Sequence, residues 1–268
     1  MENLIPEKDF KQIRDYIFSH AGIDLAPGKR AMVSSRLAKR LRHYKLEKYT
    51  DYFKIVMAAD NLLERQVVID LLTTNETYFF REMGHFNYLK EQFLPALKAN
   101  QLVRVWSAAS STGEEAYSLA MLLADSIGMQ NKWEIFGSDI CTEVIRTART
   151  AHYSTNRIQG IPPDYLKKYC LKGTGPYQRT LLIDPQLQKK VSFSQVNLNT
   201  SLPKIGEFDL IFLRNILIYF NQETKQQIVN RVISTLKPGG LFFIGHSETL
   251  KGLCDKVEQV KPTIYQKL

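Results

Sequence analysis

Two adjacent carboxylates, Glu114 and Glu115, follow a tight turn of small residues in the stretch VRVWSAASSTGEEAYSLAMLLAD, residues 103–125. Its apolar start predicts a buried strand, and the segment after Gly113 predicts a helix. A strand, a turn and a helix N-terminus usually form a cradle for a phosphate. This turn has one glycine instead of three, and the two glutamates would repel a phosphate. The pattern therefore indicates a ligand without phosphate.

The neighbouring motifs favour S-adenosylmethionine. A dinucleotide site would carry GxGxxG and an ATP site a Walker lysine, and SAASSTG has neither. S-adenosylmethionine contains adenosine, no phosphate, and cationic sulfonium and amino groups that carboxylates attract. Asp139 ends the next expected strand, WEIFGSD, where an acid usually accepts hydrogen bonds from the ribose hydroxyls. Asp139 has an alternative interpretation, the N-cap of the helix that TEVIRTA predicts.

A further strand pattern, FDLIF, is followed by Arg214 and Asn215. Open α/β sheets bind ligands at the carboxyl ends of their strands, so these side chains are expected at the same site. Tyr219 lies four residues beyond Asn215 in an otherwise apolar run. Taken alone, this tyrosine is more typical of core packing with a satisfied hydroxyl group.

The elements that must position these residues alternate between strand and helix from Leu102 onward, which predicts a doubly wound α/β sheet. An insert at about residues 161–193 interrupts the alternation with short runs split by Gly and Pro, and predicts a small antiparallel β-subdomain. Residues 1–75 show only helical patterns, with Thr50 and Asn61 as expected N-caps. Residues 76–100 are expected to form a link, a loop leading into a helix that Pro95 bends or ends.

Composition limits the class of protein. The chain has 268 residues, 44% of them hydrophobic, as in an ordinary globular protein, and no apolar run near the ~20 residues that would span a bilayer. No secretory signal is apparent, and Cys141, Cys170 and Cys254 form no CxxC pair, so we expect a cytoplasmic protein. The five histidines show no metal-ligand spacing, and we expect no metal.

The net charge of +9 favours an acidic partner and is locally concentrated. Residues 29–48 carry eight Lys or Arg against the single acid Glu47. An apolar stripe from Met32 to Leu41 places Arg36, Lys39 and Arg40 largely on other sides of the expected helix. This segment is either a docking face or simply a solvated helix face.

The motifs NETYFFRE, VWSAASSTGEEAYSLAM, FGSDI, VNL and FLRNILIYF, closing with GHSETL, together resemble the CheR-type chemotaxis receptor methyltransferases. The resemblance covers nearly the whole chain in the same order. It implies a doubly wound methyltransferase sheet in residues 101–268, with a β-subdomain insert, preceded by an all-α docking domain and a link that contributes to the cofactor site. It further implies methyl transfer from S-adenosylmethionine to glutamate side chains on chemoreceptor cytoplasmic helices, which gives methyl esters and S-adenosylhomocysteine.

The resemblance also implies roles for individual residues. Arg81 and Tyr219 are the candidates for positioning the reacting groups. The expected docking residues, which could steer an acidic receptor bundle, are Arg36, Lys39, Arg40 and Arg42. In some family members the β-subdomain grips a tether peptide at the receptor C-terminus by strand addition, and others lack the tether. We expect a monomer without nucleic-acid or membrane partners. The cofactor contacts are expected at Asn75, Thr77, Arg81, Glu115, Asp139, Asn197, Leu198, Arg214 and Asn215.

A glutamate substrate agrees with the absence of a visible Ser/His/Asp or Cys/His set, because a carboxylate of pKa ~4.3 is ionised at pH 7 and needs no general base. The main rival is a DNA amino-methyltransferase, which would place [Asp/Asn]-Pro-Pro-aromatic where this chain has RNILIYF; its one Pro-Pro lies in IPPDY, residues 161–165. An NAD-dependent dehydrogenase is disfavoured by the missing glycines. A catalytically inactive relative that docks on receptors or senses the cofactor remains a second alternative.

Overall fold

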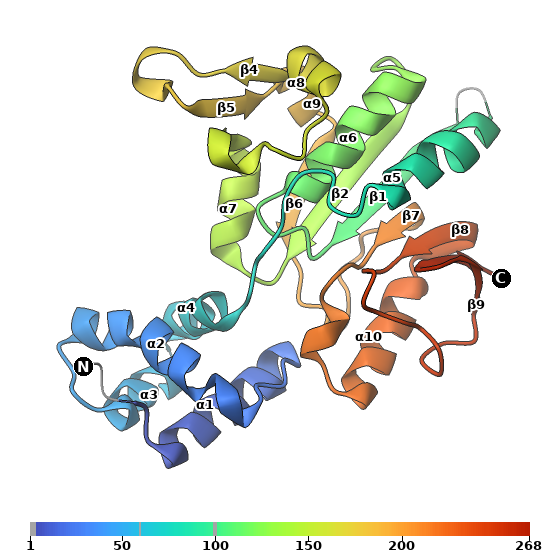
Figure 1. Cartoon of the computed structure of the whole chain (residues 1–268). Helices are drawn as coiled ribbons and strands as arrows, with labels where there is room; N and C mark the ends of the chain where they lie inside the picture. Colours follow the sequence, from blue (N-terminus) through green and yellow to red (C-terminus); the bar gives the residue numbers. More distant parts are fainter. Residues whose placement is uncertain (1–3, 59, 99–100) are drawn as a thin grey trace.

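The computed structural model describes residues 4–58, 60–98 and 101–268, so the last two residues of the expected link, 99–100, lie outside it. Four helices form a group apart from the α/β domain (Figure 1). Gly22 ends α1 in the left-handed conformation, and Asn61 caps α4, as predicted, by accepting from the backbone N–H of Glu64. The helices are α1 (Glu7–Ala21), α2 (Arg30–Tyr44), α3 (Tyr49–Met57) and α4 (Leu62–Leu72).

The predicted cap at Thr50 was wrong, because α3 begins one residue earlier, at Tyr49. The Thr50 hydroxyl donates instead to Asp9 on α1, at 2.8 Å. It therefore links two helices of the N-terminal domain rather than ending one of them. The expected link contains α5 (Gly84–Tyr88), which continues as a π-turn over Leu89–Phe93 and ends in a 3₁₀ turn at Pro95.

The main sheet has seven strands in the order β6-β2-β1-β7-β8-β10-β9. The first five strands in this order pair in parallel, and β10 and β9 add an antiparallel edge. This mixed α/β sheet confirms the predicted fold class. The strands are β1 (Val103–Ala108), β2 (Trp133–Asp139), β6 (Val191–Gln195), β7 (Phe208–Phe212), β8 (Leu236–Phe243), β9 (Val257–Lys261) and β10 (Ile264–Lys267).

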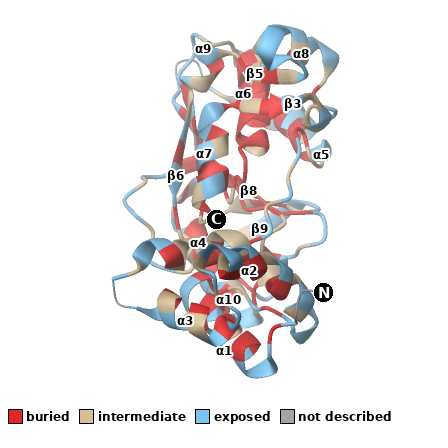
Figure 2. Cartoon of the chain, turned by 90° about the vertical axis from the view of Figure 1, so that its left-hand side faces the viewer, coloured by how far each residue is buried: buried red, intermediate tan, exposed pale blue. Residues whose placement is uncertain are grey.

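Alternation along the central strands supplies a core on each face of the sheet. Val105 and Leu210 pack on the face covered by α6 (Glu114–Ile127) and α7 (Thr142–Thr150), whereas Trp106 and Ile211 point to the face covered by α10 (Gln222–Ile233). This is the two-residue period of a strand buried on both sides. Buried residues accordingly follow the strands and α6 (Figure 2). Among the described residues, no helix is long and apolar enough to cross a membrane.

A second sheet of three antiparallel strands, in the order β3-β5-β4, forms the β-subdomain. The sheet begins at His152, earlier than the expected boundary of about 161. Residues 191–193, expected at the end of the insert, belong to β6, because Val191 pairs with Ile135 of the main sheet. The elements are β3 (His152–Ser154), α8 (Pro163–Tyr169), β4 (Cys170–Lys172), β5 (Thr180–Ile183) and α9 (Pro185–Gln188).

Hydrogen bonds hold the helical domain against the carboxyl ends of the strands. The Asp70 carboxylate at the end of α4 accepts from the backbone N–H and the hydroxyl of Thr142, at 3.0 and 2.5 Å. The backbone N–H of Asp24 donates to the carbonyl of Tyr219 at 2.8 Å. These contacts make the helical domain one wall of the site described next.

Candidate active site

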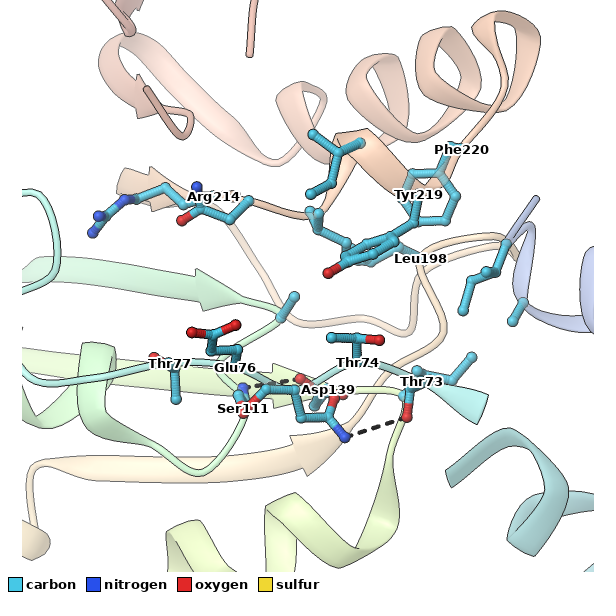
Figure 3. A pocket seen from close by; sticks show the side chains of 18 of the residues that line it. Thr73, Thr74, Glu76, Thr77, Ser111, Asp139, Leu198, Arg214, Tyr219 and Phe220 are labelled. Atoms are coloured by element: carbon cyan, nitrogen blue, oxygen red, sulfur yellow. Dashed lines mark hydrogen bonds between the residues drawn. The ribbon is translucent and has the colours of Figure 1, made fainter. Parts of the chain in front are cut away.

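A cavity of about 340 Å³ lies where the carboxyl ends of β1, β2 and β7 meet the N-terminal domain. The chain leaves β1 between β2 on one side and β7 on the other, which is the point where open α/β sheets bind ligands. Arg214 and Tyr219 lie on one wall, opposite Asp139 and the segment from Thr73 to Thr77 (Figure 3). Its volume is that of a small-molecule site.

The turn after β1 is fixed by backbone geometry. The N–H groups of Ala109 and Ser110 both donate to the carbonyl of Ser138, at 2.8 Å each. Gly113 has φ 93°, and a Cβ there would come within 2.9 Å of the Ala148 Cβ on α7. The one glycine of the turn is therefore required by its left-handed backbone and by close packing, and close approach to a phosphate is not needed to explain it.

Asp139 ends β2 with its side chain buried in the cavity wall. Its two carboxylate oxygens accept from the backbone N–H groups of Ser111 and Cys141, at 2.9 and 3.0 Å. The alternative interpretation of Asp139 as the N-cap of α7 was wrong, because Cys141 is the N-cap residue; Asp139 holds the backbone of Cys141 and lines the cavity. Each oxygen retains capacity to accept a ligand hydroxyl. Burial raises the pKa of Asp139 to about 6.

Cofactor affinity is expected to decrease as the pH is lowered through this raised pKa, because Asp139 then becomes protonated. Hydroxyl donors favour the ionised carboxylate, so affinity for S-adenosylhomocysteine should drop by up to about tenfold per pH unit below about pH 6. Titration calorimetry from about pH 7.5 to about pH 5 measures this slope. The Asp139→Asn variant should bind more weakly and without the slope. A slope retained in that variant would assign the titration to another group, such as Glu115.

Arg214 lies between two carboxylates beside the turn. Its guanidinium contacts Glu82 Oε2 at 3.0 Å and Glu115 Oε2 at 3.1 Å, and only 2% of its side chain is exposed. The Ser107 hydroxyl donates to the other oxygen of Glu115 at 2.6 Å. Burial raises the pKa of Glu115, although Arg214 and Ser107 act in the opposite direction. One guanidinium therefore compensates two acids in this part of the wall.

The polar groups of Arg81 and Tyr219 make few contacts with the rest of the protein. The Arg81 guanidinium lies over the ring of Tyr78, 5.6 Å from its centroid, and donates to the carbonyl of Glu76 at 3.1 Å. The half-buried Tyr219 side chain reaches into the cavity (Figure 3), and its hydroxyl has no hydrogen-bond partner in the described part of the chain. Both groups can therefore meet an incoming polar group.

The structure brings all of the residues expected to contact the cofactor to one cavity, together with Tyr219. Asn197 has a second task, because its side chain donates to the carbonyl of His20 at 2.7 Å and joins the two domains. The lining residues are Asn75, Thr77, Arg81, Glu115, Asp139, Asn197, Leu198, Arg214, Asn215 and Tyr219.

Sequence reasoning missed the apolar wall from the helical domain, where Ile23, Leu25 and Met32 line the cavity. The wall depends on a backbone bridge between Ile23 and Phe220, which no local pattern shows. It also missed Glu82, although this acid follows Arg81 directly in NETYFFRE. The position of Glu82 directly beside Arg81 in that motif could have indicated its place near the site.

The prediction of an exposed basic face on α2 was wrong for Arg36 and Arg40. Arg36 donates to the carbonyls of Leu71 and Thr73, at 3.1 and 2.7 Å, and Arg40 makes two bonds to the buried Glu64 carboxylate. Both guanidinium groups thus stabilise the helical domain. Lys39 and Arg42 are exposed, and none of the four expected docking residues lines the cavity.

The residues present fit S-adenosylmethionine. A buried carboxylate at Asp139 can accept ribose hydroxyl groups, while Glu115 and Arg214 offer both charges to an amino-acid end. Apolar side chains of Val196, Leu198 and other residues complete the wall, as an adenine ring requires.

Comparisons with known proteins agree with this geometry. The family description "CheR methyltransferase, all-alpha domain" matches residues 8–73, and "CheR methyltransferase, SAM binding domain" matches residues 75–266. The chemotaxis protein methyltransferase of Salmonella typhimurium is 41% identical over 263 residues, which cover 97% of this chain and 90% of that protein. Chemotaxis protein methyltransferase 2 of Pseudomonas aeruginosa is 38% identical, covering 96% of this chain and 92% of that protein.

Proposed function

The chain belongs to the CheR methyltransferase family, and on that premise we propose that it methylates glutamate side chains of chemoreceptors. The family match makes S-adenosylmethionine its cofactor and makes the chain a methyltransferase of chemotaxis. The proposal adds the acceptor, a glutamate carboxylate on a receptor's cytoplasmic helices, and the products, a methyl ester and S-adenosylhomocysteine. It also implies a monomer that acts in the cytoplasm.

The observation that carries the proposal is a cavity wall that offers two polar donors, Arg81 and the Tyr219 hydroxyl, to an acceptor that is already ionised. Among the described residues that line the cavity, none is a histidine or a cysteine. A hydroxyl or amine acceptor would have to lose a proton, whereas a glutamate carboxylate is already ionised at pH 7. What a carboxylate needs on leaving water is a donor, and Arg81 and the Tyr219 hydroxyl supply two.

The chain's own residues then perform binding, alignment and exclusion of water. S-adenosylmethionine, when bound, supplies a methyl group on a positively charged sulfur. Asp139, Glu115 and Arg214 hold one reactant, and Arg81 with Tyr219 orients the carboxylate toward it. Fixing two reactants in line can lower a barrier by roughly 7–11 kcal/mol. The helical domain closes the site from one side, which strengthens each of these polar contacts.

The test is the chemical class of the product. The enzyme is incubated with a receptor cytoplasmic fragment and S-adenosylmethionine labelled in its methyl group. Mild alkali is expected to release the label as methanol, because esters hydrolyse there and methylated amines do not. Alkali-stable label would contradict a glutamate acceptor, and absence of any transfer despite cofactor binding would favour a catalytically inactive docking protein.

Docking on the receptor is proposed to use Lys39 and Arg42, the two exposed members of the predicted basic face. Opposite charges steer association and are screened by salt. The double variant Lys39→Glu/Arg42→Glu should raise the KM for a receptor fragment about tenfold at low salt, with less effect at high salt and none on cofactor affinity.

The matched control reverses two exposed lysines outside α2, Lys90→Glu and Lys189→Glu, and so makes the same change in net charge. This control should shift the receptor KM much less. If both double variants raised the receptor KM equally, the effect would be one of net charge alone, and α2 would not be the docking surface.

The β-subdomain is proposed to bind a receptor's C-terminal tether peptide by strand addition. β4 is an edge of its sheet, and the side chain of Leu171 on this strand is 49% exposed. An added strand gains backbone hydrogen bonds along such an edge and apolar contact with alternate side chains. Leu171→Asp should therefore weaken binding of that peptide without changing cofactor binding.

A further inference from the structure

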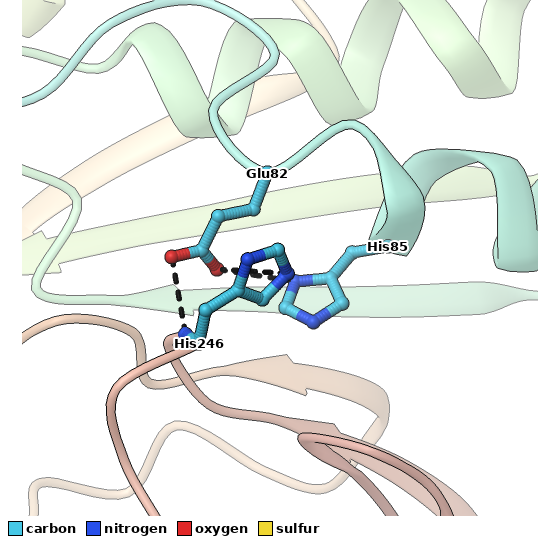
Figure 4. Close-up of side chains that lie close together, drawn as sticks. All are labelled: Glu82, His85 and His246. Atoms are coloured by element: carbon cyan, nitrogen blue, oxygen red, sulfur yellow. Dashed lines mark hydrogen bonds and ion pairs between the residues drawn. The ribbon is translucent and has the colours of Figure 1, made fainter.

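Three potential metal ligands meet beside the cavity. Glu82 follows Arg81 in the link, His85 lies on α5, and His246 follows β8 (Figure 4). One ligand atom from each side chain lies within 4.8 Å of the other two. Glu82 Oε2 is 3.6 Å from His85 Nδ1 and 3.9 Å from His246 Nε2. These contacts are too long for hydrogen bonds, yet only slightly longer than the ~3.4 Å between ligands that Zn–N and Zn–O bonds of ~2.0–2.1 Å imply.

The His85 ring points an unused nitrogen at this cluster. The residue is 2% exposed, and its Nδ1 atom has no hydrogen-bond partner among the residues that the structure describes. Its Nε2 atom lies 2.8 Å from the Thr263 hydroxyl, which itself donates to the Pro262 carbonyl at 2.6 Å. Because that hydroxyl has one hydrogen, Nε2–H is the donor of the first bond and Nδ1 carries the lone pair. This lone pair and the Glu82 Oε2 atom, 3.6 Å apart, can therefore bind one cation together.

The surroundings resemble the support that metal ligands usually have. The Nε2–H bond to Thr263 fixes the orientation of the His85 ring, and Glu82 Oε1 accepts from the backbone N–H of His246 and the Asn215 side chain, at 3.1 and 3.2 Å. The His246 side chain is 60% exposed, so a fourth position is open to water. Two imidazoles, one carboxylate and water form a common zinc ligand set.

Arg214 connects this cluster to the cofactor cavity. It lies 3.0 Å from the same oxygen, Glu82 Oε2, and a bound cation would compete with it there. Arg214 would keep its contact with Glu115 at 3.1 Å, so the displaced guanidinium stays neutralised. Because Arg214 lines the cavity, its displacement would alter the site that holds the cofactor.

We propose that Glu82, His85 and His246 form a Zn²⁺ site whose occupancy weakens cofactor binding. Linkage requires the converse, that bound cofactor or its product weakens zinc binding by the same factor. The site is a regulatory input separate from methyl transfer, which needs no metal.

The test titrates Zn²⁺ into the full chain by calorimetry, without and with saturating S-adenosylhomocysteine. We expect one zinc per chain and at least about fivefold weaker zinc binding with the nucleoside present. Co²⁺ in place of zinc should give a visible absorption band without the charge-transfer band of a thiolate, which excludes the three cysteines as ligands. S-adenosylhomocysteine affinity without metal is measured in parallel, so that a failed cofactor site is distinguished from a failed zinc site.

The decisive variant is His246→Ala, which keeps the backbone N–H that Glu82 uses and leaves the cavity wall intact. It should lose zinc affinity by at least about tenfold while binding S-adenosylhomocysteine as the wild type does without metal. His43→Ala, at an exposed histidine on α2, is the control and should change neither. Equal zinc affinity in wild type and His246→Ala would overturn the site, and zinc binding that leaves S-adenosylhomocysteine affinity unchanged would overturn the coupling.

Discussion

Replacing Arg214 by alanine is expected to lower the free energy of unfolding by about 3 kcal/mol or more and to abolish measurable binding of S-adenosylhomocysteine. The guanidinium is almost fully buried and contacts both Glu82 and Glu115. Its removal leaves two acids, whose side chains are only 11% and 14% exposed, without a counter-charge, which costs more than the pairs themselves contribute. Urea denaturation measures the first effect and calorimetry the second.

The control for this prediction is Arg146→Ala. Arg146 also pairs with a glutamate, Glu143 at 2.7 Å, but both side chains are exposed. Its loss should leave the urea midpoint unchanged, since exposed ion pairs contribute little. An Arg214→Ala protein as stable as the wild type, with normal S-adenosylhomocysteine affinity, would show that Glu82 and Glu115 are neutralised in another way.

Arg81→Ala is expected to reduce the single-turnover rate of methyl transfer about 100-fold while leaving the fold intact. Within the described residues, the Arg81 side chain makes one hydrogen bond, to the Glu76 carbonyl, and a contact with the Tyr78 ring, so little stability depends on it. Its charge is the one that an acceptor carboxylate would meet on leaving water. Rapid-quench measurement with a receptor fragment and labelled cofactor gives the rate of the chemical step.

Tyr219→Phe is the graded companion of this variant. It removes only the hydroxyl, a neutral donor, so the rate should fall less, by about tenfold. Arg81→Lys keeps the positive charge but lacks the planar guanidinium. Its single-turnover rate should lie between those of Arg81→Ala and the wild type. Near-normal single-turnover rates in Arg81→Ala would remove Arg81 from the proposed mechanism.

Much of the site could be predicted because each functional residue stands at the end of a recognisable strand or within a motif. Asp139 ends WEIFGSD, and Arg214 comes just after FDLIF; parallel strands bring their carboxyl ends to one edge, so these residues had to meet. The fold class followed for the same reason, from the alternation of strand and helix.

What could not be predicted depends on contacts between distant segments. The position of Arg36 and Arg40 on α2 was read correctly, but their long side chains reach back to the Thr73 carbonyl and to Glu64, which a helix pattern cannot show. His85 and His246 lie in different motifs with no ligand spacing between them, and only the pairing of β8 with β10 and the packing of α5 bring them together.

The central claim is that the cavity beside Asp139 and Arg214 holds the cofactor through the residues named here. The most direct measurement is calorimetric titration of S-adenosylhomocysteine into the wild type and Asp139→Ala at about pH 7.5, above the raised pKa of this group. The account predicts one binding site per chain in the wild type and affinity at least about tenfold weaker in the variant. Equal affinity in both proteins would contradict the claim and place the cofactor elsewhere on the chain.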